Sequence, residues 1–114
     1  MAIKLSHFIK FVSNMDKSVA FHRDTLGLPL KFASPEWSEF ATGETTLALH
    51  PASAKYPAGT GMAGYKTDDL KKLYAKRHEL GLKFTTAPEM QHGGLMAHFL
   101  DADGAECTIE QRPA

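Results

Sequence analysis

The chain repeats itself, and this internal duplication restricts its possible folds more than any other feature. A stretch that begins Leu26-Gly27-Leu28 is echoed by one that begins Leu80-Gly81-Leu82, and in both a Lys-Phe pair and then a Pro-Glu pair follow. Further matches keep the same order along the chain and pair Asn14 with Asp68, Phe40 with Phe99, and Gly43 with Gly104. Chance explains one shared tripeptide better than an ordered series. We therefore predict one domain of two similar modules, residues 1–52 and 58–114, joined by a linker at 53–57.

The first module has the pattern of a strand, a helix and three more strands. Alternating apolar and polar residues over positions 3–12 predict the first strand. Asn14 is a favourable N-cap for the helix that follows, and Gly27 is a favourable stop. Short β segments are then expected near 29–33, 36–42 and 45–50. The module is therefore predicted to be βαβββ.

The second module repeats this order with a clearer helix. Thr67 or Asp68 is expected to cap the helix, and apolar residues recur along one side of it at helical spacing, from Leu70 to Leu80. The later β segments are expected near 83–87, 94–101 and 105–111. The loop around His92 between the first two of them is expected to be flexible.

Charge and composition exclude several classes of protein. The 114 residues contain 13 basic and 13 acidic side chains, so the net charge of zero argues against nucleic acid or an anionic membrane as the main partner. No apolar run approaches the length of a membrane span, and the first residues lack the apolar core of a signal peptide. A single cysteine, Cys107, permits no internal disulfide. The chain is expected to be a cytoplasmic globular domain.

Two stretches carry a family resemblance. The run from Asn14 through Ser18 and Phe21-His22 to Leu26-Gly27 resembles the D-x-x-x-S-x-x-F-Y-x-x-x-L-G signature of the vicinal oxygen chelate superfamily, with histidine in place of tyrosine. The run from Phe99 to Gly104 resembles that superfamily's F-x-D-P-D-G turn. The superfamily includes glyoxalase I, bleomycin-resistance proteins and extradiol dioxygenases. The resemblance implies an α+β fold in which two βαβββ modules form a curled mixed sheet around a shared cavity, and it implies a homodimer.

The same resemblance implies four metal-ligand positions, of which one keeps a ligand. The positions fall on His7, Ala48, Met62 and Thr108. Because an alanine, a thioether and a neutral hydroxyl hold a hard divalent ion poorly, we expect no metal cofactor. The alternative is a displaced site. His50 and Glu110 lie two residues beyond Ala48 and Thr108, so a metal held by His7, His50 and Glu110 is the fallback.

Strand alternation predicts the side chains that line the cavity. His7 shares a face with Ile9 and Phe11, and Trp37 and Glu39 lie opposite in parity to Phe40, which is expected to pack under a helix. The candidate ligand-binding residues are His7, Ile9, Trp37, Glu39, Ala48, His50, Met62, His98, Thr108 and Glu110. For Trp37 the alternative is a place in the core or in a dimer interface, and for His98 and His50 a purely structural role is equally compatible.

Three functions fit these residues. The favoured one is a metal-independent protein that binds a planar or aromatic small molecule, with Trp37 as a flat wall of the cavity. The second is a metal-dependent lyase or dioxygenase that uses the displaced site. The third is an enzyme without metal, with His7 as general base and Thr108 as hydrogen-bond donor. The sequence assigns no catalytic residue and does not identify the ligand.

Overall fold

The structure, a computed structural model, describes residues 2–112. The chain forms two compact units. One comprises Ser6–Met62, and the other comprises the chain from Ala63 onward together with its first residues up to Leu5. None of the helices in residues 2–112 is long and apolar enough to cross a membrane.

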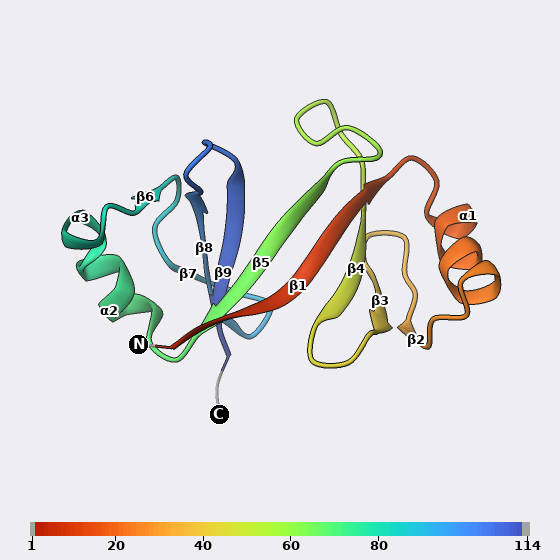
Figure 1. Ribbon diagram of the computed structural model, residues 1–114, viewed down its shortest axis with the longest axis horizontal. Coiled ribbons are helices and arrows are strands. Elements are labelled where there is room, and N and C mark those ends of the chain that lie inside the picture. The colour runs from red at the N-terminus through yellow and green to blue at the C-terminus, as the bar shows by residue number, and fades with distance from the viewer. Residues whose placement is uncertain (1, 113–114) are drawn as a thin grey trace. The chain divides into compact units, whose positions relative to one another are not determined.

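The first unit is a four-stranded mixed sheet with a helix on one face. Its elements are β1 (Ile3–Val12), α1 (Met15–Ala20), the wider helical turn η1 (Phe21–Thr25), β2 (Leu30–Phe32), β3 (Ser38–Ala41) and β4 (Thr46–Pro51). The strand order is β2-β3-β4-β1 (Figure 1). β1 pairs with β4 in parallel, and the remaining pairs are antiparallel.

Local chemistry explains where the first helix begins and ends. Asn14 is extended, and its side-chain oxygen accepts from the backbone N–H of Lys17 at 3.0 Å, which satisfies one of the free donors of the first turn. Gly27 has a φ of 71°, a left-handed conformation that glycine adopts without steric cost. Between them Val19 packs onto Phe40 and Leu49 of the sheet. The predicted helix is therefore present, with η1 as its last part.

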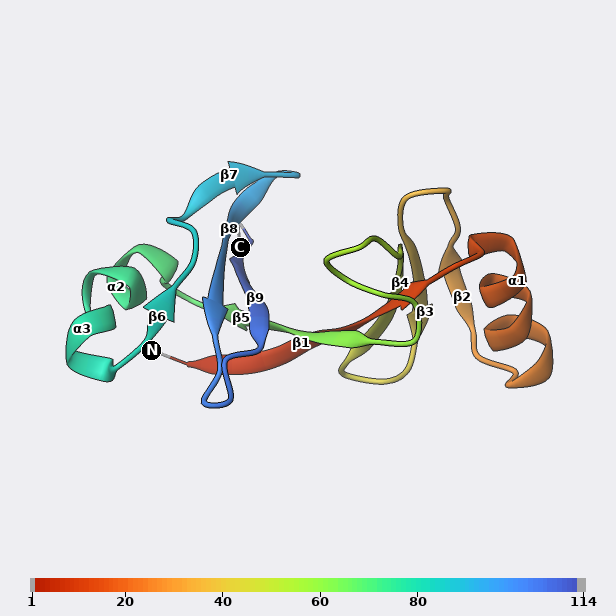
Figure 2. The ribbon, with the colours of Figure 1, turned by 90° about the horizontal axis from the view of Figure 1, so that it is seen from above.

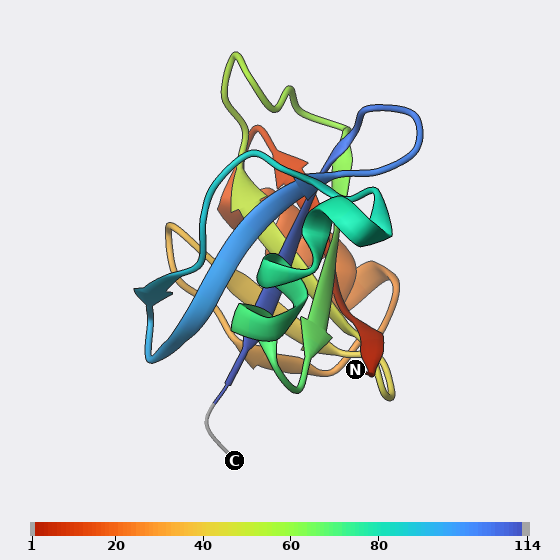
Figure 3. The ribbon, with the colours of Figure 1, turned by 90° about the vertical axis from the view of Figure 1, so that its left-hand side faces the viewer.

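The second unit repeats the plan. Its elements are β5 (Gly61–Thr67), α2 (Leu70–Ala75), α3 (Arg77–Leu80), β6 (Lys83–Phe84), β7 (Glu89–Gln91), β8 (Gly94–Leu100) and β9 (Glu106–Gln111). The strand order is β5-β9-β8-β6, with β5 and β9 parallel and β7 also paired with β8 (Figure 2). The two helices of this unit lie against its sheet (Figure 3), and Leu70 and Leu73 of α2 pack on Ala97 and Ile109. The α+β class and the two βαβββ modules are confirmed.

The second helix differs from its prediction at both ends. Its N-cap is Asp69, whose carboxylate accepts from the Lys72 N–H at 3.0 Å, and neither Thr67 nor Asp68 takes that place. Thr67 is still the last residue of β5 and is buried, so the chain turns two residues later than expected. The helix is interrupted at Lys76, and Leu80, expected on the apolar side, is 52% exposed.

The loop expected around His92 is a tight hairpin. β7, which the sequence did not predict, pairs antiparallel with β8 so that Gln91 faces Gly94. The two residues between them, His92 and Gly93, have φ values of 49° and 82°. Positive φ at both central positions is the conformation of a type I′ turn, the preferred connection of a two-residue hairpin.

The segment expected as a linker folds back onto the first unit. Ala52 donates its N–H to Val12 O at 2.9 Å, and the N–H of Ser53 reaches Tyr56 O at 2.9 Å. Gly59 donates to Phe11 O at 3.0 Å. Residues 52–60 are therefore a structural loop of the first unit, and the boundary between the units falls after Met62.

Candidate functional site

The sheet of the first unit has two chemically different faces. α1 covers the face that carries Phe40 and Leu49, whereas the opposite face holds its own buried cluster, to which the helix contributes no residue. We call that opposite face the aromatic face. Its residues are His7, Ile9, Phe11, Trp37, Glu39, Ala48, His50, Tyr56 and Met62. Trp37 and Glu39 thus lie on the side that alternation predicts, opposite the fully buried Phe40.

Strand register explains why these side chains meet. Ile9 of β1 pairs with Ala48 of β4, and Ala48 in turn pairs with Glu39 of β3. Two residues further along the same strands, and on the same face, Phe11 lies beside His50. Because neighbouring strands are only about 5 Å apart, paired residues on one face are in direct contact.

Five rings form a continuous row across this face. The ring centroids lie 6.1 Å apart for His7 and Trp37, 6.2 Å for Trp37 and His50, and 5.6 Å for His50 and Phe11, all edge to face. Tyr56 then stacks on Phe11 at 4.7 Å, with only 10° between the planes. These are the separations at which aromatic rings attract one another, so the row is a mutually supported apolar wall.

A single carboxylate organises one end of the row. Trp37 donates its indole N–H to Oε2 of Glu39 at 2.7 Å, which fixes the orientation of the indole. Nε2 of His7 lies 3.8 Å from the same oxygen, and Nζ of Lys31 lies 3.8 Å from Oε1. The Glu39 side chain is 18% exposed and that of His7 20%, so both groups are partly shielded and still within reach of a ligand.

A backbone hydrogen bond determines which ring nitrogen of His50 carries the hydrogen. Its Nδ1 lies 2.8 Å from the carbonyl oxygen of Pro51. A carbonyl only accepts, so Nδ1 must carry the hydrogen. In the neutral ring the lone pair is then on Nε2. His50 can therefore accept a hydrogen bond from a ligand at the middle of the ring row.

The donors on this face do not fit a divalent metal ion. At two of the positions implied by the resemblance, Ala48 is fully buried and offers no donor, and Met62 is 6% exposed within an apolar cluster. No group of three or more His, Cys, Asp or Glu side chains within residues 2–112 is arranged to hold a metal. Of the fallback ligands, His7 and His50 both contact Trp37, with ring centroids 6.1 and 6.2 Å from it.

The remaining candidates lie together in the second unit. His98 of β8 pairs with Thr108 of β9, on the face opposite Ala97 and Ile109. The His98 backbone N–H donates to Thr86 Oγ1 at 2.9 Å. Glu110 is 9% exposed and its Oε2 lies 3.1 Å from Nη2 of Arg112. Its carboxylate is thus already engaged by a cation.

The sequence did not single out two residues of the site. Lys31 reaches Glu39 from β2 and also donates to Thr46 Oγ1 at 3.0 Å. Tyr56 comes from the loop, where no periodicity indicates which way a side chain points. The one usable signal was composition, because an aromatic residue in a Pro/Ala/Gly-rich connection is unusual.

Cys107 is excluded as a thiolate ligand or nucleophile. It is buried beside Ile109 in β9, and burial, with smaller contributions from the charges of Asp101 and Glu106, raises the pKa of its thiol. The thiol therefore stays protonated at neutral pH.

Comparison with known proteins identifies the family. A family model described as the Glyoxalase/Bleomycin resistance protein/Dioxygenase superfamily matches residues 4–109, nearly the whole chain. The chain belongs to this superfamily. An uncharacterised relative, YraH of Bacillus subtilis (strain 168), is 28% identical over 123 residues, which cover 89% of this chain and 92% of YraH.

Solved structures show the same superfamily fold. A hypothetical protein from Bacillus halodurans C-125 superposes with a TM-score of 0.80 at 16% identity, over 100% of this chain and 97% of that one. A Streptomyces coelicolor methylmalonyl-CoA epimerase in complex with 2-nitronate-propionyl-CoA gives 0.76 at 14% identity, over 97% and 95%. At these identities the likeness establishes the fold alone.

Proposed function

We propose that this chain binds a planar, aromatic small molecule on the aromatic face without using a metal ion. The observation that carries the proposal is the row of five rings, held in place at one end by the Glu39–Trp37 hydrogen bond. An apolar wall with a few fixed polar groups is the usual composition of a small-molecule site.

The polar groups define what the ligand must offer. His50 accepts a hydrogen bond at Nε2, and His7 and Glu39 lie at the end of the row next to Trp37. A flat ligand stacked on Trp37 would carry a hydrogen-bond donor near His50. In the second unit, Thr108 is proposed as a ligand-binding residue from the superfamily resemblance, and His98 from strand alternation.

The decisive experiment measures binding with Trp37 altered. A screen of aromatic compounds, with acyl-CoA thioesters included because the epimerase relative binds one, is read by quenching of Trp37 fluorescence. For a hit, Trp37→Ala should weaken binding measured by calorimetry roughly 5- to 150-fold, which corresponds to about 1–3 kcal/mol for stacking on an aromatic side chain.

Phe8→Ala is the matched control, because it removes an exposed aromatic side chain of β1 whose parity is opposite to that of His7 and Ile9. Equal loss of affinity in both variants would contradict the proposal. So would a stoichiometric Ni, Zn, Mn or Fe ion that resists dialysis and whose removal abolishes binding.

We also propose that the chain acts as a cytoplasmic homodimer. Several large apolar side chains are exposed, among them Phe8 of β1, at 44%, and Leu26 just after η1, at 53%. Exposed apolar surface of this kind favours association.

A further inference from the structure

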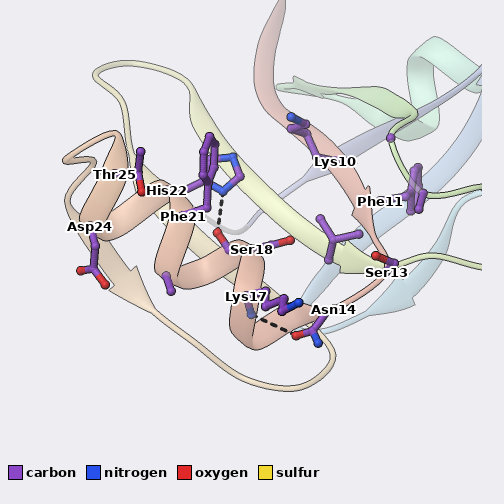
Figure 4. A pocket seen from close by; sticks show the side chains of 14 residues that line it. Lys10, Phe11, Ser13, Asn14, Lys17, Ser18, Phe21, His22, Asp24 and Thr25 are labelled. Carbon is purple, nitrogen blue, oxygen red and sulfur yellow. Dashed lines mark hydrogen bonds between the residues drawn. The ribbon is translucent and has the colours of Figure 1, made fainter.

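A groove lies between β1 and the helix of the first unit. It has a volume of about 710 Å³, and all of its lining belongs to the first unit. The walls are formed by β1 and the turn after it, by α1 and η1, and by the loop at Ala58 and Gly59 (Figure 4). Lys10 and Val12 have the opposite parity to His7 and Ile9, and Phe11 is the one residue of the aromatic face that also lines the groove.

His22 is a buried titratable group in this groove that the proposed function does not use. The residue is 6% exposed, and its ring packs against Phe40 at 5.5 Å between centroids. Its Nδ1 lies 2.7 Å from the Ser18 carbonyl oxygen, so Nδ1 carries a hydrogen and Nε2 is the nitrogen left for a ligand.

Within residues 2–112, Nε2 of His22 has no hydrogen-bond partner. Every fully buried side-chain nitrogen or oxygen in these residues has one. Nε2 is therefore accessible from outside. His22 is one of the residues that line the groove, and the groove is where a ligand can reach this ring.

The charges around His22 favour an anion. Lys10 of β1 and Lys17 of α1 line the groove, and neither has an ion-pair partner among the described residues. The one carboxylate there, Asp24, is held by Arg23 through two hydrogen bonds of 2.8 and 2.9 Å, which also lower the pKa of that carboxyl. The groove thus offers donors and two uncompensated positive charges, beside the apolar surface of Phe21 and Val12.

We infer that this groove is a second binding site, for a small organic anion whose carboxylate or phosphate contacts Lys10, Lys17 and His22 while its apolar part lies on Phe21. The histidine donates to the anion only when both nitrogens carry hydrogen. Lys10, Lys17 and Asp24 are the charged side chains that line the groove, and Arg23 holds the Asp24 carboxylate.

The test is an NMR titration of the whole chain with octanoate in one arm and phenyl phosphate in the other. Saturable shifts confined to His22, Lys10, Lys17 and their neighbours are expected, and the arm that saturates at the lower concentration identifies carboxylate or phosphate. Lys17→Gln should weaken binding about twofold to fivefold, the size of one exposed ionic contact.

Lys71→Gln, an exposed lysine in α2, is the control and should change nothing. His22→Phe keeps a ring against Phe40 but removes Nε2, and it should weaken binding at least as much as Lys17→Gln does. If that variant does not fold, the Lys17 variant still decides the matter. Shifts that never saturate, or equal losses in the Lys17 and Lys71 variants, would overturn the inference. If either probe quenched the fluorescence of Trp37, that probe would bind at the aromatic face instead of in the groove.

Discussion

Glu39 gathers an indole N–H, an imidazole and an ammonium group around one carboxylate. These contacts differ in value. The hydrogen bond from Trp37 is short and partly shielded, whereas the Lys31 contact is an exposed ion pair of a kind that contributes about 0–1 kcal/mol. The main role of Glu39 is therefore to hold the indole plane in position.

This role predicts how two substitutions differ. Glu39→Ala leaves the indole N–H without its acceptor and should lower the free energy of unfolding by about 1 kcal/mol. Glu39→Gln keeps an amide oxygen in place and should cost less. Urea denaturation followed by far-UV circular dichroism measures both. Equal losses would show that the charge of Glu39 matters more than its hydrogen bond.

Residue patterns predict which side chains share a face but not which ones touch. Alternation placed Trp37 and Glu39 opposite Phe40, as the structure shows, because a strand has a fixed period of two. It could not show that Glu39 accepts from Trp37, since that bond depends on side-chain rotamers. It also could not place Tyr56, whose position depends on the conformation of a loop.

At the level of elements, helix starts and turns were the hardest to predict. Asp68 and Asp69 are equally good N-caps in sequence, and the choice between them depends on how far β5 extends before the chain turns. β7 was missed because its pairing depends on the His92-Gly93 turn, in which a non-glycine residue adopts positive φ.

The position of the cap leads to a direct test. Asp69→Ala removes the acceptor for the Lys72 N–H and should destabilise the second unit by about 1 kcal/mol. Asp68→Ala, one residue earlier, removes two long contacts, from the Ala2 N–H at 3.3 Å and from the Thr67 hydroxyl at 3.4 Å, and should cost less. Thermal unfolding of the two variants side by side distinguishes them. A larger loss of stability in the Asp68 variant would show instead that Asp68 caps the helix, as the sequence suggested.

At the scale of the whole molecule, the duplication was the most informative signal. Each repeat has its own core, around Phe40 and Leu49 in one unit and around Leu70 and Ile109 in the other. The fold could be predicted because both modules reuse one pattern. The ligand could not, because its shape depends on loops and on side-chain contacts that have no period in the sequence.

The molecular mass of the protein in solution tests the proposed dimer. Covering exposed apolar side chains such as Phe8 and Leu26 should drive association. Sedimentation equilibrium is expected to give twice the mass of the 12.5 kDa chain. A single-chain mass across the accessible concentration range would rule the dimer out.

The loop that follows β4 also has a consequence for solubility. Phe11 donates its backbone N–H to Thr60 O and accepts from the Gly59 N–H, both at 3.0 Å. On its other side β1 is paired with β4. The main-chain groups of Phe11 are thus occupied by the chain's own loop, and a strand from another molecule cannot add there. The loop therefore occupies the backbone hydrogen-bonding groups of β1 at Phe11 and closes this part of the strand to edge-to-edge pairing.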